Sequence, residues 1–132
     1  MKMIDEESMS MVEEGQPIYN IRHRAFYFSK NIIEFIRIVK YERIYYSLFD
    51  QLLRAATSVG ANLVEGSAGV SGRDFINYNA IALKSANETK YWLCLIKEAN
   101  FLEKNTLDEL IKEADEISKI IATIIINLKK RV

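Results

Sequence analysis

The sequence has few of the residues that build tight turns and no long apolar run. Its 132 residues include one proline and five glycines, too few for a fold of many short strands joined by turns. No apolar run reaches the roughly 18–20 residues that a membrane span needs. The first residues also lack the apolar stretch of a secretory signal. We therefore expect a helical, cytoplasmic protein.

Cysteine and histidine are nearly missing, which restricts the available chemistry. Cys94 is the only cysteine and His23 the only histidine. A lone thiol forms no disulfide framework and fits a reducing compartment. The apolar neighbours of Cys94 predict a small buried side chain rather than a nucleophile. A ferritin-like di-iron site uses two Glu-x-x-His pairs, which one histidine cannot supply. We predict no enzymatic activity, no metal and no cofactor.

Charged residues balance overall but are unevenly placed along the chain. There are 18 basic and 18 acidic residues, and the formal net charge is zero. Residues 1–14 carry one lysine and five acids, a net of −4, so the remaining 118 residues sum to +4. We predict a flexible acidic N-terminal tail over residues 1–16. Residues 17–132 are of ordinary size for one domain.

Helical periodicity dominates the rest of the chain. Apolar side chains recur at steps of three and four residues in four segments, over residues 21–39, 48–63, 75–96 and 107–128. Four long helices with short connections predict an all-α fold, an antiparallel up-down-up-down four-helix bundle. The predicted buried face of the third helix consists of Phe75, Tyr78, Ala82, Ser85, Thr89, Trp92 and Ile96.

Polar and glycine-rich stretches mark the boundaries between these helices. Residues 40–43 form a short polar link, and residues 66–72 contain three glycines, which is typical of a loop. Ser71 stands three residues before an acid and predicts the start of the third helix. Thr106 and Asn105 each stand three residues before an acid as well, and they predict the start of the fourth.

Two of the predicted helices carry more apolar residues than a lone bundle buries. The surplus residues are Ile76, Ile81, Leu83, Tyr91, Leu93 and Leu95 on the third helix, and Ile120, Ile125 and Ile126 on the fourth. A helix in a four-helix bundle needs only one apolar face. The surplus therefore predicts self-association.

Basic residues point toward a nucleic-acid ligand. A cluster at the start of the first helix is interleaved with aromatic residues, and a second cluster ends the fourth helix. Aromatic and basic side chains together suit base stacking and phosphate neutralisation. We expect the two clusters at opposite poles of the bundle. The candidate contacts to RNA or DNA are Arg22, Arg24, Lys30, Arg73, Lys129, Lys130 and Arg131.

Polar residues at fixed spacing carry a family resemblance. Residues 51–65 read Q-L-x-R-x-x-x-S-x-x-x-N-x-x-E, Asp74 and Phe75 follow the glycine loop, and residues 85–89 read S-x-x-E-T. The sequence resembles the bacterial four-helix-bundle proteins encoded in intervening sequences of 23S ribosomal RNA genes, over about residues 18–130. It is similar as well to the accessory variability determinant proteins of diversity-generating retroelements. The resemblance implies a homopentamer without established enzymatic activity. In the retroelement branch, it implies binding to the reverse transcriptase and its RNA.

The polar residues of this pattern also have a structural interpretation. Residues three or four apart lie on one face of a helix. The polar side chains in the segment 54–65 can therefore contact those in the segment 85–88. Such a network fixes the register of the two helices more than it stabilises them. The predicted structural polar network consists of Arg54, Ser58, Asn62, Glu65, Ser85 and Glu88.

Three functions remain open from the sequence. The first is a self-associating, homopentameric scaffold that binds nucleic acid or a ribonucleoprotein partner. The second is an adaptor that binds a protein through the surplus apolar faces of the third and fourth helices. The third is an accessory protein of a retroelement reverse transcriptase. This sequence departs from the retroelement branch in its zero net charge and its acidic tail.

Overall fold

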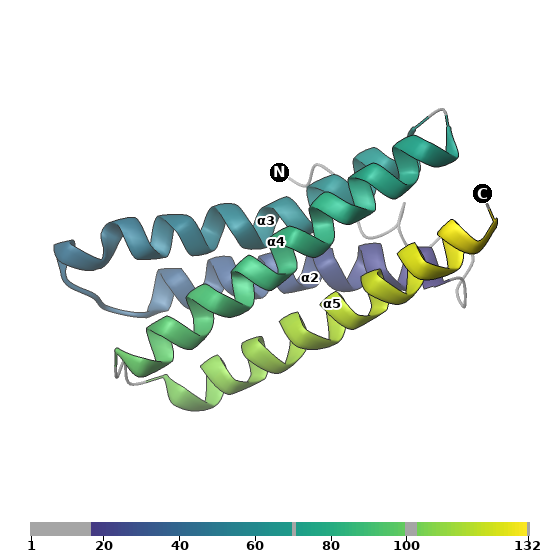
Figure 1. Cartoon of the computed structure of the whole chain (residues 1–132). Coiled ribbons are helices and arrows are strands. Elements are labelled where there is room, and N and C mark those ends of the chain that lie inside the picture. The colour runs from purple at the N-terminus through teal and green to yellow at the C-terminus, as the bar shows by residue number, and fades with distance from the viewer. Residues whose placement is uncertain (1–16, 70, 100–102, 132) are drawn as a thin grey trace.

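The computed structural model describes residues 17–69, 71–99 and 103–131. Within these ranges the chain forms four long helices, α2 (Pro17–Ile38), α3 (Tyr46–Ser67), α4 (Gly72–Glu98) and α5 (Lys104–Arg131), and no strand (Figure 1). A short 3₁₀ turn, η1 (Arg43–Tyr45), precedes α3. The predicted all-α fold is confirmed. The predicted tail over residues 1–16 lies outside the described residues.

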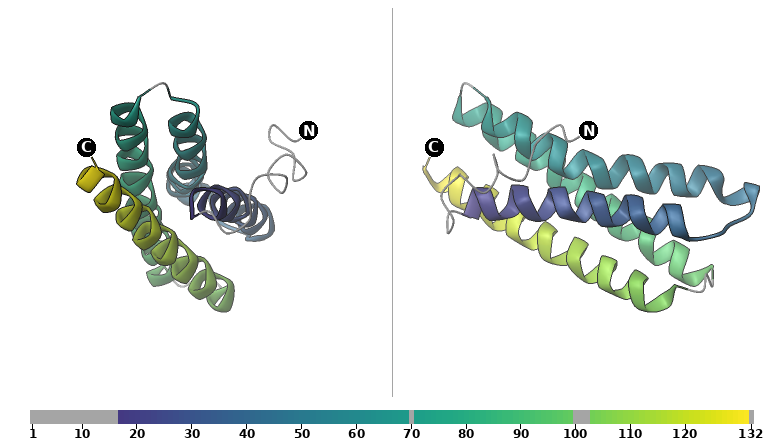
Figure 2. Two further views of the ribbon diagram at one scale, coloured as in Figure 1. Left: turned by 90° about the vertical axis from the view of Figure 1, so that its right-hand side faces the viewer. Right: turned by 180° about the vertical axis from the view of Figure 1, so that it is seen from behind.

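The four helices run antiparallel to their chain neighbours and close into a bundle. α4 packs against α3 and α5, and α2 completes the bundle by packing against the same two helices (Figures 1 and 2). α2 and α4 begin at one pole of the bundle, and α3 and α5 end there. We call this end the termini pole. The opposite end, which holds the α2–α3 and α4–α5 connections, we call the link pole.

A continuous apolar core fills the bundle. On α5 the buried side chains include Leu107, Ala114, Ile117 and Ile121, as the three–four spacing predicts. Ile125, predicted as surplus, is only 8% exposed and belongs to this core. That part of the surplus prediction is wrong, because the buried face of α5 is wide enough to include it.

The buried face of α4 differs from the predicted one. Its buried residues are Asn79, Ala82, Ala86, Thr89, Leu93 and Ile96. Tyr78, Ser85 and Trp92, predicted as members of this face, are half-buried at its margin. Leu93, predicted as surplus, is fully buried. α4 packs against both α3 and α5, so its buried face is centred between the two contacts.

The predicted helix starts are correct for α4 and wrong for α5. The Ser71 hydroxyl accepts a hydrogen bond from the Asp74 amide at 3.1 Å, which caps α4. In α5 the Leu107 amide already donates to the Glu103 carbonyl at 2.9 Å. Asn105 and Thr106 therefore lie inside the first turn instead of capping it.

Candidate nucleic-acid interface

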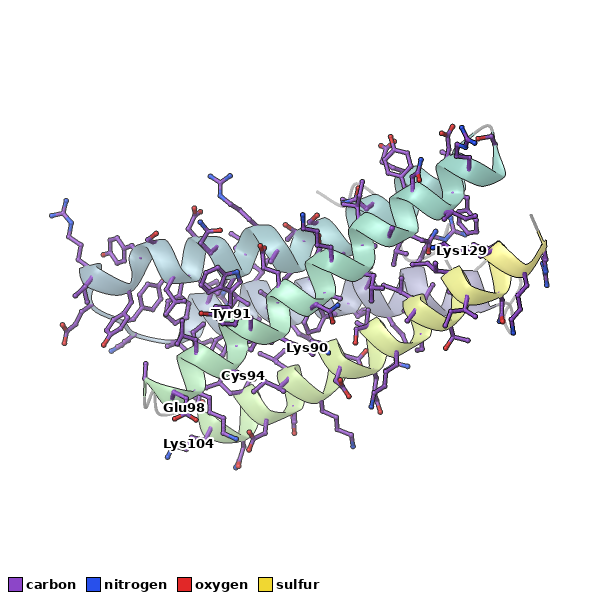
Figure 3. All side chains as sticks on the ribbon, in the orientation of Figure 1. Lys90, Tyr91, Cys94, Glu98, Lys104 and Lys129 are labelled. Atoms are coloured by element: carbon purple, nitrogen blue, oxygen red, sulfur yellow. The ribbon has the colours of Figure 1, made fainter. Side chains whose placement is uncertain are left out.

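Five of the seven candidate cations lie at the termini pole. Arg22 is near the start of α2, Arg73 opens α4, and Lys129, Lys130 and Arg131 form the last turn of α5. Figure 3 shows Lys129 at this end of the bundle and Lys104 at the other. The expectation of opposite poles is wrong. A chain that crosses an antiparallel bundle four times ends where it began. We call these five residues the basic pole.

Contacts at the helix ends fix the positions of residues in the basic pole. Arg22 Nη1 donates to Ser67 Oγ at 2.7 Å, which joins the start of α2 to the end of α3. The Ser67 hydroxyl in turn donates to the Val64 carbonyl at 2.8 Å. The three basic residues that end α5 lie where the helix dipole favours positive charge. Arg73 is the second residue after the Ser71 cap and is exposed.

Acidic residues at the same pole are fewer. Glu65 is exposed near the end of α3, and Asp74 is half-buried in the first turn of α4. The basic pole therefore has an excess of positive charge among the described residues. A concentrated positive surface attracts polyanions over distances of about a Debye length, roughly 8 Å at physiological salt.

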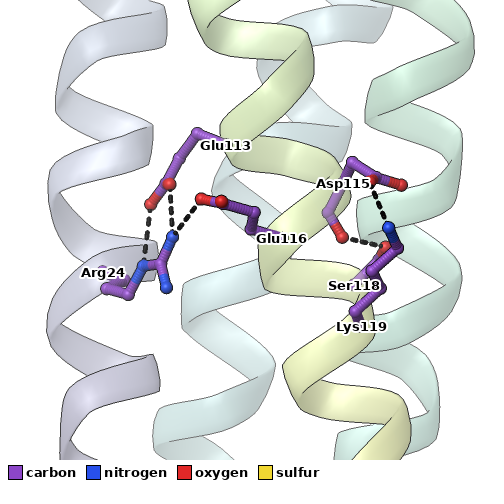
Figure 4. A network of polar contacts seen from close by, with 6 residues as sticks. All are labelled: Arg24, Glu113, Asp115, Glu116, Ser118 and Lys119. Atoms are coloured by element: carbon purple, nitrogen blue, oxygen red, sulfur yellow. Dashed lines mark hydrogen bonds and ion pairs between the residues drawn. The ribbon is translucent and has the colours of Figure 1, made fainter.

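Arg24 is engaged within the bundle. Its Nε donates to Glu113 at 3.0 Å, and its Nη2 donates to Glu113 and, at 2.8 Å, to Glu116 (Figure 4). The hydrogen bond to Glu113 raises the pKa of Arg24, and the second carboxylate adds to the effect. This cation joins α2 to α5, so its donors are already directed at protein carboxylates.

Lys30 lies apart from the basic pole. It is exposed on α2, two turns beyond Arg22, and its ammonium is 5.4 Å from the centre of the Tyr27 ring. This distance fits a cation–π contact. The structure therefore separates Arg24 and Lys30 from the other five candidates.

The predicted polar network is present in a smaller form. The Ser58 and Ser85 hydroxyls are 2.9 Å apart across the α3–α4 contact. Asn62 Nδ2 donates to Ser58 Oγ at 2.9 Å and to the Ser58 carbonyl at 2.8 Å. These three half-buried residues satisfy one another and join α3 to α4.

Three predicted members lie outside this network. Arg54 Nε donates to Asp50 at 2.9 Å, one turn earlier on α3, and both side chains are exposed. Glu65 and Glu88 are exposed. A carboxylate is far more stable in water than in a buried site without a cation, which is why these acids face outward.

The sequence pattern did not reveal the ion pairs between α4 and α5. Asp115 accepts from Lys90 at 3.2 Å and from Lys119 at 2.9 Å, and Lys97 pairs with Asp108 at 2.7 Å. Hydrogen bonds from Lys119 and Lys90 lower the pKa of Asp115. The i,i+4 spacing of Asp115 and Lys119 is a sequence signal, whereas contacts between helices have none.

Cys94 is exposed rather than buried, so the prediction from its apolar neighbours is wrong. Leu93 and Ile96 occupy the buried face of α4, and that places Cys94 outward. Among the described residues, no group of three or more His, Cys, Asp or Glu side chains could hold a metal ion. None of the helices within the described ranges combines the length and apolarity needed to cross a bilayer.

The fold and the polar sequence pattern together place this chain in a class of small antiparallel four-helix bundles. A family model for the 23S rRNA-intervening sequence protein matches residues 19–123. A crystal structure from Bacteroides thetaiotaomicron, of a protein of unknown function in the S23 ribosomal protein family, is 32% identical with a TM-score of 0.74. The match covers 80% of this chain and 97% of that one. No match was found among curated proteins. The chain belongs to the 23S rRNA intervening-sequence protein family.

Proposed function

We propose that this protein is a non-enzymatic, self-associating scaffold that binds nucleic acid through the basic pole. The observation that supports this proposal is the gathering of five cations, from three helices, at one end of the bundle. Phosphate contacts of this kind supply most of the affinity of proteins for nucleic acid. The family name refers to 23S rRNA, which makes RNA the first ligand to test.

Self-association would strengthen this binding. Ile81, Tyr91 and Leu95 are 46%, 60% and 42% exposed on α4, and Ile126 is 55% exposed on α5. Steps of ten and four residues, each close to a whole number of helical turns, place Ile81, Tyr91 and Leu95 on one outward face of α4. Burying this face against another copy would remove it from water. The proposed assembly is a homopentamer, as the family resemblance implies, and it would repeat the basic pole five times.

The proposal places the protein in the cytoplasm. A reducing compartment keeps an exposed, unpaired thiol such as Cys94 from forming disulfides. Ribosomal RNA is made and used in the same compartment in bacteria. The proposed scaffold needs neither a metal nor a cofactor.

An RNA titration tests the basic pole. The probe is a fluorescein-labelled single-stranded RNA of about 20 nucleotides, with duplex DNA of equal length alongside it. The variant Lys129→Ala/Lys130→Ala/Arg131→Ala removes three charges at the termini pole. Its matched control, Lys40→Ala/Arg43→Ala/Lys104→Ala, removes three exposed charges at the link pole. Each lost phosphate contact should lower the slope of log affinity against log salt by about 0.7–0.9.

We expect the termini-pole variant to weaken RNA binding at least about tenfold and to lower the salt slope by about two. The link-pole variant should bind within about twofold of the wild type, because its charges are more than a Debye length from the ligand. Equal losses in both variants, or no binding by the wild type at low salt, would overturn the proposal.

A protein-binding adaptor is the second candidate, and the exposed apolar face of α4 favours it. The partner would then dock on Ile81, Tyr91 and Leu95. Salt separates the two functions, because apolar docking persists at salt concentrations that release phosphate contacts. If the protein is an adaptor, Tyr91→Lys should abolish binding of the protein partner. If it is the proposed scaffold, the same variant should break the assembly and weaken RNA binding through the loss of repeated basic poles.

A further inference from the structure

A groove of about 480 Å³ lies between the second half of α2 and the first half of α5. Phe28, Phe35, Val39 and Leu110 contribute apolar side chains to it, and Ile38, which is 58% exposed, stands at its edge. α2 packs less closely against α5 than α4 does, so this contact remains open. Glu113, which pairs with Arg24, lies at the end of the lining that is farthest from the link pole.

The groove has the length of a short helix. Its lining covers residues 28–39, at the end of α2 and one residue beyond it, and residues 103–113, at the start of the antiparallel α5 and one residue before it. At 1.5 Å per residue each wall is roughly 16 Å long, or about three helical turns. A helix of that length presents apolar anchors at positions i, i+3 or i+4, and i+7. The length suits a three-turn helix. Its apolar side would meet the exposed Ile38 and the outer edges of the floor residues, which are each at most 8% exposed.

The rim of the groove is acidic. Glu34, Glu103, Glu109 and Glu113 line it, and no lysine, arginine or histidine does. Glu34 is held by Arg37 at 2.7 Å, and Glu113 is held by Arg24. In the described part of the chain, Glu103 and Glu109 form no ion pair and are exposed. Two carboxylates therefore face solvent beside an apolar floor.

We propose that this groove binds a basic amphipathic helix of a protein partner, with its apolar side on the floor and its lysines or arginines beside Glu103 and Glu109. The acidic rim repels phosphate, so the ligand is a protein segment and not nucleic acid. The site lies on a different face from the basic pole and stands independently of the proposed RNA binding.

A second copy of this chain fits the groove less well than a separate partner. The longest unbroken basic run of the described chain, Lys129–Arg131, is a single turn. Leu128 beside it packs partly against the chain's own core. A single helical turn would fill about a third of the length of the groove. Leu128, the apolar residue beside this turn, already packs against the chain's own core.

A labelled model peptide tests the groove. The probe is an amphipathic leucine–lysine peptide of about eleven residues, and the matched peptide has glutamate in place of lysine. The groove variants are Glu103→Lys/Glu109→Lys and Ile38→Asp. Their controls are Glu88→Lys/Glu98→Lys, with the same charge change on α4, and Ile44→Asp, at a residue that is 79% exposed outside the groove. All substituted side chains are exposed, and circular dichroism verifies that each variant folds.

We expect saturable binding of the lysine peptide. Each groove variant should weaken this binding at least about tenfold, and its control should weaken it less than about twofold. Amide shifts in NMR spectra should concentrate in residues 28–39 and 103–113. No binding, equal losses in groove and control variants, or preferential binding of the glutamate peptide would overturn the proposal. If a second copy covers the groove, the peptide fails to bind and Ile38→Asp lowers the solution mass, which also overturns it.

Discussion

Gly66 in the last turns of α3 and Tyr78 in α4 approach so closely that a Cβ atom on Gly66 would lie 2.9 Å from the Cβ of Tyr78. Gly66 is buried there. Two helix backbones that connect through a short loop can therefore pack tightly where the connection begins. This contact determines how α3 and α4 meet beside the basic pole.

Gly66→Ala should lower the free energy of unfolding by about 1–3 kcal/mol, since the added methyl group overpacks the contact with the Cβ of Tyr78. Urea unfolding measures the loss. Gly60→Ala is the matched control, because a Cβ at Gly60 would meet the Ala25 side chain at an ordinary 3.5 Å. The control should be neutral or stabilising by up to about 1 kcal/mol, from the higher helix propensity of alanine. Equal changes in the free energy of unfolding for Gly66→Ala and Gly60→Ala would show that the close approach at Gly66 does not limit the packing of α3 on α4.

The Ser58–Ser85 contact predicts a measurable coupling between α3 and α4. A double-mutant cycle with Ser58→Ala and Ser85→Ala should give an interaction free energy of about 1 kcal/mol, as for a neutral hydrogen bond that is half-buried. The pair Ser47→Ala and Ser85→Ala provides the control, because Ser47 is exposed in the first turn of α3. A cycle for Ser58 and Ser85 that closes to zero would contradict the network.

The lowered pKa of Asp115 predicts a loss of stability in acid. The folded state binds the proton of this carboxyl more weakly than the unfolded state does. Its stabilising contribution is therefore fully present above the ordinary aspartate pKa, about 3.9, and is lost as the pH falls through the lowered value. Asp115→Asn should destabilise the protein at neutral pH.

Urea unfolding from neutral pH down to about pH 2 measures this difference between Asp115→Asn and the wild type. The difference should shrink as the pH falls below about 4, and added salt should reduce it at neutral pH. A difference that is constant over the whole pH range would instead indicate a packing effect.

Arg24 should contribute little to nucleic-acid binding, although it belongs to the basic cluster in the sequence. Its guanidinium already donates to Glu113 and Glu116. Arg24→Gln should lower the free energy of unfolding by about 1 kcal/mol or less, because the three side chains are partly exposed. RNA affinity should change by less than about twofold. A loss as large as that of Lys129→Ala/Lys130→Ala/Arg131→Ala would show that Arg24 contacts the ligand directly.

The helices and their order could be predicted from the sequence because apolar spacing is a local signal. The stripe on α5, from Leu107 to Ile121, is strictly periodic and was predicted correctly. On α4 the same reasoning chose the wrong centre. Asn79, which the apolar spacing omits, is buried there because it donates to the carbonyl of Phe75, one turn earlier, at 2.8 Å. Thr89, which the spacing includes, donates in the same way to the carbonyl of Ser85 at 2.7 Å. Polar residues that satisfy themselves in this way disguise a buried face.

The site was less predictable, because its geometry depends on residues far apart in the chain. Arg24 and Glu113 are 89 positions apart, and no local pattern indicates that this cation is engaged. The acidic groove likewise combines halves of α2 and α5 that meet only in the folded chain. The cations of the basic pole were identified from the sequence, but their common location follows from the number of times that the chain crosses the bundle.

Solution mass tests the central claim, a self-associating scaffold that concentrates its basic poles, most directly. Size exclusion with light scattering at low and high salt distinguishes association through apolar contacts from association through charge. The account predicts a mass near five times the 15.3 kDa of one chain, stable in high salt because apolar burial holds the copies together. It further predicts that Tyr91→Lys, on the outward face of α4, lowers this mass. A monomer of 15.3 kDa at both salt concentrations would contradict the account.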